Sequence, residues 1–159
     1  MMMPGPSVGI RIVTYQRRND NTRRGLTATA RSVLNQTYRN WKVYLYGDRY
    51  ESDSEFRELA ALFPPHKVVA VNLPDAPERD RYTGKKLWMC GGITTINQCL
   101  DDMTRAGVRH MAILDDDDIW TPDHLQTTVD GYRKFPDASL VFTRGNHRQM
   151  GVLPIATPE

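Results

Sequence analysis

The sequence predicts an α/β fold in which a mostly parallel sheet is flanked by helices. Short apolar segments with strand-like alternation are separated by segments whose apolar residues fall at helical spacing, which is the pattern of parallel sheets. The chain has 159 residues, of which 40% are hydrophobic and 25% are charged, as is usual for a globular protein. We therefore expect one domain, which buries roughly two-thirds of the surface of its unfolded chain.

Five segments have the composition and alternation of strands. The first, VGIRIVT at residues 8–14, places Val8, Ile10 and Ile12 on one face, although Arg11 is unusual for a central strand. The other four strand-like segments are residues 41–47, 67–71, 110–114 and 138–143.

Helical patterns lie between these strands. Thr22 is a plausible cap for a helix in which apolar residues follow at helical spacing. A short helix over residues 56–63 is stopped by two prolines, and residues 88–105 predict a longer one. Thr121-Pro122 opens another helix with a cap and a first-position proline. Residues 73–84 are rich in Pro, Asp and Arg and are predicted to be a loop.

Both ends of the chain lack clear periodicity. We expect residues 1–6 to be disordered, residues 7–143 to form the domain and residues 144–159 to be a tail. The N-terminal segment lacks the basic and apolar regions of a signal peptide, and no apolar stretch approaches the roughly 20 residues that span a bilayer. Cys90 and Cys99 match no zinc spacing and are interpreted as free thiols in a reducing compartment. These features predict a cytoplasmic protein without a transmembrane segment, and the net charge of +2 gives no argument for a nucleic-acid partner.

A run of four carboxylates, Asp115–Asp118, follows the fourth predicted strand directly in the segment ILDDDDIW. Ligands of open α/β sheets bind outside the carboxyl ends of the strands, so the run falls at the expected place. Asp115 and Asp117 are at alternate positions and can reach toward the same side of an extended segment. Such oxygen ligands suit Mg²⁺ or Mn²⁺, and Mg²⁺ usually takes further ligands from substrate phosphates. The run therefore predicts a metal site and a phosphate-bearing substrate.

The same run has a structural interpretation. Asp118, together with Asp123, could simply complement the dipole of the helix that follows. This explains the three preceding aspartates less well, because they lie further from the helix.

Four segments, in the expected order, resemble patterns of the family 2 glycosyltransferases. VGIRIVTYQR resembles their opening strand and turn, V-S-V-I-I-P-T-Y-N-R, and ARSVLNQTYRNWKVYLYGD resembles their first helix and second strand. INQCL resembles the helix ahead of the metal strand, and ILDDDDIWTPDHL resembles the D-x-D segment with the helix after it. Over residues 7–143 the chain thus resembles the N-terminal, nucleotide-sugar-binding half of such an enzyme, which has the GT-A fold.

The resemblance implies contacts to the nucleotide base. Thr14 and Tyr15 occupy the turn that lies against the base in the family. The family's second strand usually ends in two aspartates, one of which contacts the base. Here Gly47 takes the first position and only Asp48 remains. The resemblance therefore implies Asp48 as the base contact and leaves the identity of the base open.

The resemblance also implies contacts to metal and phosphate. Asp117 matches the metal ligand of the D-x-D pair, Asp115 contacts ribose or metal, and Asp116 between them could do either. Lys86 falls in the loop region where related enzymes place a basic residue near the diphosphate. Arg17 follows the base-binding turn and could also meet phosphate, although a solvated face is an equal alternative for such basic residues.

The implied reaction transfers a sugar from a nucleotide-diphosphate donor to an acceptor hydroxyl, with inversion and with Mn²⁺ or Mg²⁺ at the diphosphate. Inversion requires a general base, which the family supplies from an acidic motif after the fifth strand. After Asp137 the only acidic residue is Glu159, so the catalytic base is unknown and absent from the expected region. We therefore expect a truncated or minimal donor-binding domain, whose exposed apolar surface self-association could cover.

Two other functions fit the same residues. One is another metal enzyme that acts on phosphates, such as a nucleotidyltransferase, which shares the fold class and an acidic strand end. The other is a non-enzymatic module in which the aspartates bind a cation or cap a helix. The sequence does not determine the base, the sugar or the acceptor.

Overall fold

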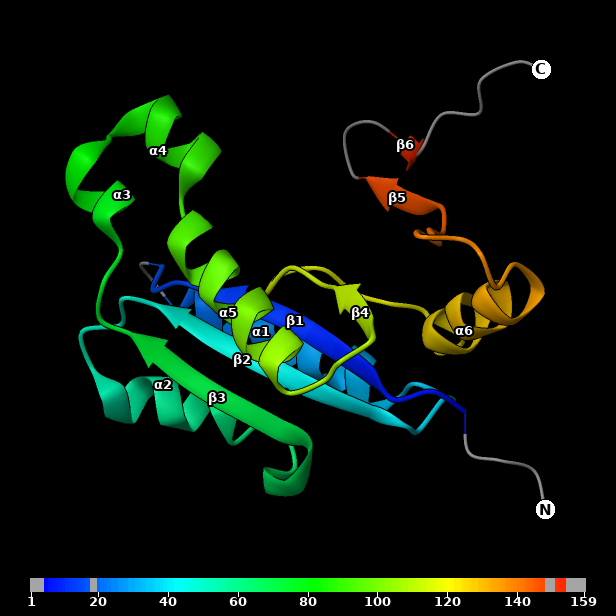
Figure 1. Cartoon of the computed structure of the whole chain (residues 1–159). Helices are drawn as coiled ribbons and strands as arrows, with labels where there is room; N and C mark the ends of the chain where they lie inside the picture. Colours follow the sequence, from blue (N-terminus) through cyan, green and yellow to red (C-terminus); the bar gives the residue numbers. More distant parts are fainter. Residues whose placement is uncertain (1–4, 18–19, 148–150, 154–159) are drawn as a thin grey trace.

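The computed structural model describes residues 5–17, 20–147 and 151–153 of the chain (Figure 1). Its main sheet has four parallel strands in the order β3-β2-β1-β4. The strands are β1 (Val8–Thr14), β2 (Trp41–Asp48), β3 (Val68–Leu73) and β4 (His110–Ile113). The predicted α/β class with a mostly parallel sheet is confirmed.

Helices cover both faces of this sheet (Figure 1). One face carries α1 (Asn21–Leu34), α2 (Asp53–Ala60) and α6 (His124–Lys134). The other face carries α5 (Ile93–Arg105). The connections contain the short helices η1 (Pro65–Lys67), α3 (Pro77–Arg81) and α4 (Gly84–Cys90). An antiparallel pair after α6 consists of β5 (Gly145–His147) and β6 (Gly151–Leu153).

Alternate residues of the central strands build the two hydrophobic layers. Ile10 of β1 and Leu45 of β2 are completely buried on the face that carries α1 and α2. Tyr46 of β2 points to the opposite face and packs with Cys99 and Met103 of α5. Each large apolar side chain buried in this way contributes roughly 1.5–3 kcal/mol. The alternation thus decides which strand residues face α5.

The predicted strand at residues 138–143 is wrong. The segment has no strand or helix, and its side chains Leu140 and Phe142 are 73% and 68% exposed. Strand propensity yields a strand only where the backbone pairs with a sheet edge, and this segment does not pair with the edge strand β4; the chain leads instead from α6 to the separate β5–β6 pair (Figure 1). Within the described residues, the main sheet therefore ends at β4.

The predicted helix at residues 88–105 is two helices. α4 and α5 are separated by Gly91 and Gly92, and Gly92 has a φ of 78°, which is strained for residues with a side chain. The predicted loop at residues 73–84 contains the short helix α3. The prolines and charged residues of this segment favoured a loop in the sequence. Proline is nevertheless compatible with the first turn of a helix, which is where Pro77 lies.

Two predicted helix caps have other roles. Thr22 lies inside α1, and its hydroxyl accepts a hydrogen bond from the backbone N–H of Arg17 (2.7 Å) and donates one to the carbonyl of Tyr15 (2.8 Å). It therefore fixes the turn after β1. α6 begins after Thr121, whose hydroxyl donates to the carboxylate of Asp123 at 2.7 Å.

The chain ends are described in part. Gly5 and Pro6 accept hydrogen bonds from Asn40 and Tyr38, while the rest of the segment predicted to be disordered, residues 1–4, lies outside the described residues. The predicted tail contributes residues 144–147 and 151–153 to the structure, and its remaining residues lie outside the described part.

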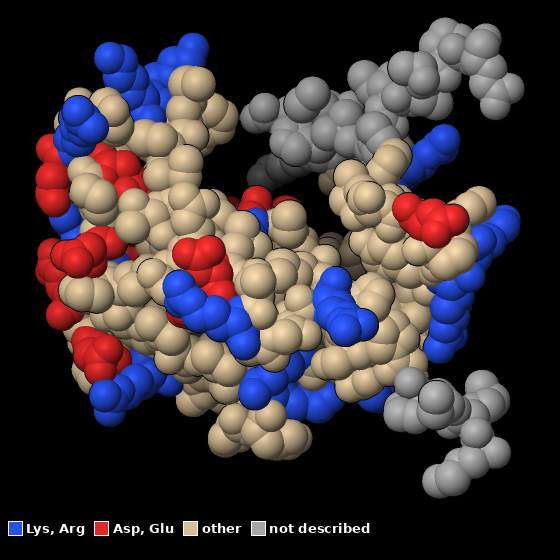
Figure 2. All heavy atoms as spheres, in the orientation of Figure 1, with Lys and Arg blue, Asp and Glu red and all other residues tan. Residues whose placement is uncertain are grey.

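Three bulk expectations can be compared with the structure. Cys90 and Cys99 are free cysteines, as predicted. In the part of the chain that the structure covers, each helix is too short or too polar to span a bilayer. Acidic and basic side chains are interspersed over the face in Figure 2, which agrees with the small net charge of +2.

Glu78 of α3 holds the N-terminus of α5. Its side chain is buried, and the carboxylate accepts hydrogen bonds from the backbone N–H (3.1 Å) and the hydroxyl (2.7 Å) of Thr94. Burial alone would raise the pKa of Glu78, but the hydrogen bonds from Thr94 outweigh it and hold this pKa below its ordinary value. The contact therefore links α3 to α5 most strongly when the carboxylate is ionised.

Glu78→Gln is expected to lower the free energy of unfolding by about 1 kcal/mol at neutral pH. Because the pKa of Glu78 is lower in the folded state, its contribution is fully present above the unfolded pKa and is lost as pH falls through the folded pKa. The difference in Tm between the two proteins should therefore begin to shrink as the pH falls below the unfolded pKa of about 4.3, and it should disappear once the pH has passed the lower folded pKa. Thermal unfolding measured from neutral to acidic pH gives this difference, and Glu51→Gln, which changes an exposed residue, is the control. A difference that does not change with pH would contradict the assignment.

Candidate functional site

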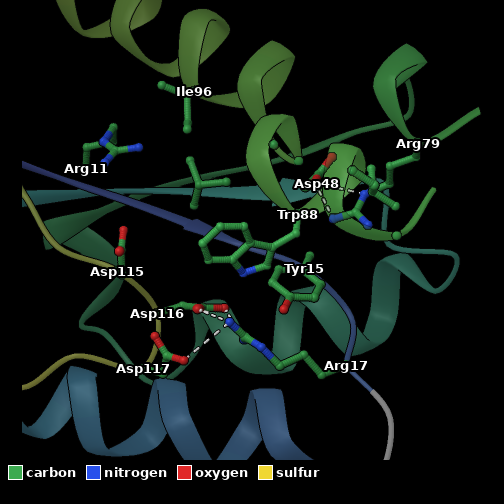
Figure 3. Close-up of a pocket in the computed structure, with 15 residues that line it drawn as sticks. Arg11, Tyr15, Arg17, Asp48, Arg79, Trp88, Ile96, Asp115, Asp116 and Asp117 are labelled. Carbon is green, nitrogen blue, oxygen red and sulfur yellow. Dashed lines mark hydrogen bonds and ion pairs between the residues drawn. The ribbon is translucent and has the colours of Figure 1, made fainter. Parts of the chain in front are cut away.

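A cavity of about 500 Å³ lies at the carboxyl ends of β1, β2 and β4 (Figure 3). Parallel sheets bring strand ends from distant parts of the chain to one edge, and ligands of such folds bind there. The turn after β1, the end of β2, the α3–α5 segment and the aspartate run each contribute to the wall. The charged and aromatic side chains that line it are Arg11, Tyr15, Arg17, Asp48, Arg79, Trp88, Asp115, Asp116 and Asp117.

Arg17 and Asp116 form a bidentate ion pair at one side of the cavity. Both guanidinium NH groups of Arg17 donate to the Asp116 carboxylate, each at 2.7 Å, and the Asp116 side chain is only 4% exposed. The hydrogen bond to Asp116 is the main cause of a raised pKa for Arg17. The Asp116 carboxylate is therefore occupied by the protein itself, and its first role is to fix the turn after β1 to the aspartate run.

Asp115 and Asp117 present their carboxylates differently. Both residues line the cavity and are exposed, and the nearer guanidinium nitrogen of Arg17 lies 3.6 Å from Asp117. The described residues contain no group of three or more His, Cys, Asp or Glu side chains arranged to hold a metal. A divalent cation here would thus have two protein carboxylates and would need other ligands. This donor set fits Mg²⁺ or Mn²⁺ in a site that shares the ion with substrate phosphates.

Asp48 is held at the opposite side of the cavity. Its carboxylate accepts hydrogen bonds from Nε of Arg79 at 2.9 Å and from the hydroxyl of Thr95 at 3.3 Å, and the residue is almost completely buried. Arg79 also lies over the ring of Tyr15, with 5.1 Å from its guanidinium carbon to the ring centroid. The guanidinium of Arg17 lies 4.1 Å from the same centroid. Both guanidinium groups therefore contact the Tyr15 ring, which lines the cavity.

Two predicted site residues lie outside the cavity lining. Thr14 is buried at the end of β1, where its hydroxyl is 2.9 Å from the hydroxyl of Tyr50. That packed phenol has a pKa raised to about 12, with burial as the main cause. Lys86 is exposed on α4, whereas Leu87 and Trp88 of the same helix line the cavity.

The structure explains the missing aspartate at Gly47. A Cβ atom at this position would lie 2.8 Å from the ring of Phe56 and 2.9 Å from Oδ1 of Asn72. The position faces α2, whereas Asp48 faces the cavity, because successive strand residues alternate between the two faces of the sheet. Glycine at position 47 is therefore a packing requirement, and only the second residue of the pair can reach the cavity.

Gly47→Asp, which restores the family's two-aspartate pattern, is expected to destabilise the protein by about 1–3 kcal/mol or more, because it overpacks the contact with Phe56. It should not strengthen nucleotide binding, since the new carboxylate would point toward α2. Thermal unfolding and calorimetric titration with UDP measure the two effects. A stable Gly47→Asp variant with tighter UDP binding would contradict this account.

Sequence reasoning did not assign three of the charged and aromatic lining residues, Arg11, Arg79 and Trp88. Arg11 drew attention only as a charge in a central strand. Arg79 lay in the segment interpreted as a loop, and it became meaningful only through its contact with Asp48. Trp88 lines the cavity although its side chain is 83% exposed. Large exposed aromatic residues are a sign of binding surfaces, but the sequence alone does not reveal which ones are exposed.

No protein-family profile matches the chain. In sequence it is similar to an uncharacterized glycosyltransferase of Acanthamoeba polyphaga mimivirus, with 36% identity over 144 residues. This match covers 90% of the chain, and the chain spans 58% of the length of that relative. 

Solved structures of S. aureus TarS have a similar fold at 13% sequence identity. The full-length structure matches with a TM-score of 0.51, over 80% of this chain and 20% of TarS. The fragment 1–349 matches with a TM-score of 0.52, and its complex with UDP matches with 0.51, each over 32% of the fragment. The chain thus has an α/β fold like that of TarS, and in sequence it is glycosyltransferase-like.

Proposed function

We propose that the chain is the donor-binding part of a glycosyltransferase that takes its sugar from a nucleotide-diphosphate donor. The observation that carries this proposal is the meeting of Tyr15, Asp48, Asp115 and Asp117 around one cavity at the carboxyl ends of three parallel strands. The similarity to a protein named as a glycosyltransferase supports the activity class. The TarS complex with UDP, which has a similar fold, supports a nucleotide ligand.

Each side of the cavity has a separate task in this proposal. Tyr15 offers its ring to the nucleotide base, and Asp48, held by Arg79, accepts hydrogen bonds from the N–H groups of the base. Asp115 and Asp117 would hold Mn²⁺ or Mg²⁺, and the ion supplies positive charge to the diphosphate as it leaves the sugar. Arg17 fixes the aspartate run through its ion pair with Asp116, and its guanidinium also lies 3.6 Å from the carboxylate of Asp117.

We assign these residues to binding and leave the general base unassigned. The cavity is lined by four carboxylates, at positions 48, 115, 116 and 117. The first and third are occupied by arginine, and the other two are proposed as cation ligands. Inversion at the sugar would need a further group, such as an ionised carboxylate, to act as general base and accept the proton of the acceptor hydroxyl.

Calorimetry with UDP, GDP and CDP, in Mn²⁺ and in chelator, tests the proposal. We expect at least one nucleotide diphosphate to bind in Mn²⁺ and to bind much more weakly in chelator. A second assay incubates the chain with a nucleotide-sugar and a nucleoside triphosphate. Consumption of the nucleotide-sugar alone would indicate a glycosyltransferase, and consumption of the triphosphate would indicate a nucleotidyltransferase. Equal affinities with metal and with chelator would contradict the proposed cation site.

A further inference from the structure

Arg11 is a buried cation in the middle of the central strand. It lies in β1, opposite Tyr44 of β2 and Ile113 of β4, and is only 7% exposed. Its neighbours Ile10 and Ile12 face the other layer, so the Arg11 side chain lies on the face that carries α5. The pattern V-S-V-I-I-P-T-Y-N-R has an apolar residue at this position, so the charge is a feature of this chain.

The described residues give Arg11 no anionic partner. None of the ion pairs in this part of the chain includes Arg11, and its buried Nε has no hydrogen-bond partner. Asp102 of α5, the helix on this face, already accepts hydrogen bonds from Tyr46 and Arg105. A buried, unpaired guanidinium is costly, because it gives up water without receiving equivalent hydrogen bonds.

The guanidinium of Arg11 is directed into the cavity. It lines the wall together with Ile96 of α5, and it lies in the part of the cavity that contains Asp115 (Figure 3). Arg17 and Arg79, the other two cationic groups in the lining, are already paired with Asp116 and Asp48. Arg11 is thus the lining cation whose charge the described residues leave uncompensated.

We propose that Arg11 binds an anionic oxygen group of the ligand, either a phosphate of the donor or a carboxylate on its sugar. The planar guanidinium donates two parallel hydrogen bonds to such a group, which suits both phosphate and carboxylate. The ligand would supply the hydrogen bonds that the protein does not. This inference rests on the proposed function for the identity of the donor, but the anion site itself can be tested without a nucleotide.

The test compares the wild-type chain with Arg11→Met, Arg11→Lys and the control Arg109→Met, in which an exposed arginine near the opposite end of β4 is replaced. Each protein is titrated in Mn²⁺ with UDP, UDP-glucose and UDP-glucuronate. Inorganic pyrophosphate is added separately in a thermal-unfolding assay. Arg11→Met is expected to weaken the relevant ligand by about 10-fold or more, Arg11→Lys less, and Arg109→Met not at all.

The pattern of losses identifies the anion. If only UDP-glucuronate is weakened by Arg11→Met, the sugar carboxylate is the partner. If all three nucleotides are weakened equally and pyrophosphate no longer raises the Tm, a phosphate is the partner. Without ligand, the Tm of Arg11→Met should equal or exceed that of the wild type, because an unpaired buried charge has been removed.

Two results would overturn the inference. One is an unchanged affinity of Arg11→Met for every ligand. The other is a lower Tm without ligand, with all three nucleotides weakened equally and with pyrophosphate still raising the Tm as it does in the wild type, which would indicate a purely structural role. If the wild type binds no nucleotide, the proposed function fails, and the pyrophosphate assay alone then decides whether Arg11 is an anion site.

Discussion

Asp117→Asn is expected to remove most of the Mn²⁺-dependent affinity for UDP. Asp117 is exposed and lines the cavity, and its carboxylate lies 3.6 Å from the guanidinium of Arg17, which is bonded to Asp116 at 2.7 Å. Loss of an outer-shell partner typically costs roughly 10–100-fold in metal affinity, so loss of a direct ligand should cost at least about 100-fold. The same result is expected for Asp115→Asn. Calorimetry with UDP in Mn²⁺ measures both.

The control for these variants is Asp101→Asn, which removes an exposed carboxylate from α5. It should bind UDP like the wild type. In chelator, all four proteins should bind UDP equally weakly. If both Asp115→Asn and Asp117→Asn retain the wild-type affinity in Mn²⁺, the cation does not bind at the end of β4.

Arg17→Met is expected to lower the free energy of unfolding by about 3 kcal/mol, because it leaves the buried Asp116 carboxylate without its partner. For a chain of this length, this corresponds to a fall in Tm of about 6–12 °C. The control is Arg23→Met, which breaks an ion pair with Glu58 whose two side chains are 50% and 63% exposed. That change should cost less than about 1 kcal/mol, because water screens the pair.

The double variant Arg17→Met with Asp116→Asn separates the interaction between the two side chains from the cost of leaving Asp116 unpaired. Since the uncompensated charge is gone, the double variant should regain a large part of the stability that Arg17→Met loses. Urea unfolding of the wild type, Arg17→Met, Asp116→Asn and the double variant gives the coupling free energy between the two side chains. An effect of Arg17→Met no larger than that of Arg23→Met would show that the turn after β1 does not depend on this ion pair.

The sequence was sufficient for those features that local pattern determines. The four parallel strands and the place of the aspartate run follow from apolar segments and from the rule that ligands bind at strand ends. The burial of Asp116 between the exposed Asp115 and Asp117 also follows the alternation that the run suggested.

Features that depend on distant partners could not be predicted. Arg17 and Asp116 are 99 residues apart, and Asp48 meets Arg79 across 31 residues, so neither pairing is visible in a local pattern. The false strand at residues 138–143 has the same origin. Its composition favours a strand, but in the described structure the segment does not pair with β4, the edge strand on that side of the main sheet.

The position of Trp88 makes occupancy of the cavity measurable by tryptophan fluorescence. Its indole is 83% exposed, whereas Trp41 is buried and Trp120 is stacked on His124 at 4.3 Å. A molecule that enters the cavity displaces water from Trp88 and leaves the surroundings of the other two unchanged. Tryptophan emission, with Trp88→Phe as the blank, therefore reports occupancy directly and without a labelled ligand.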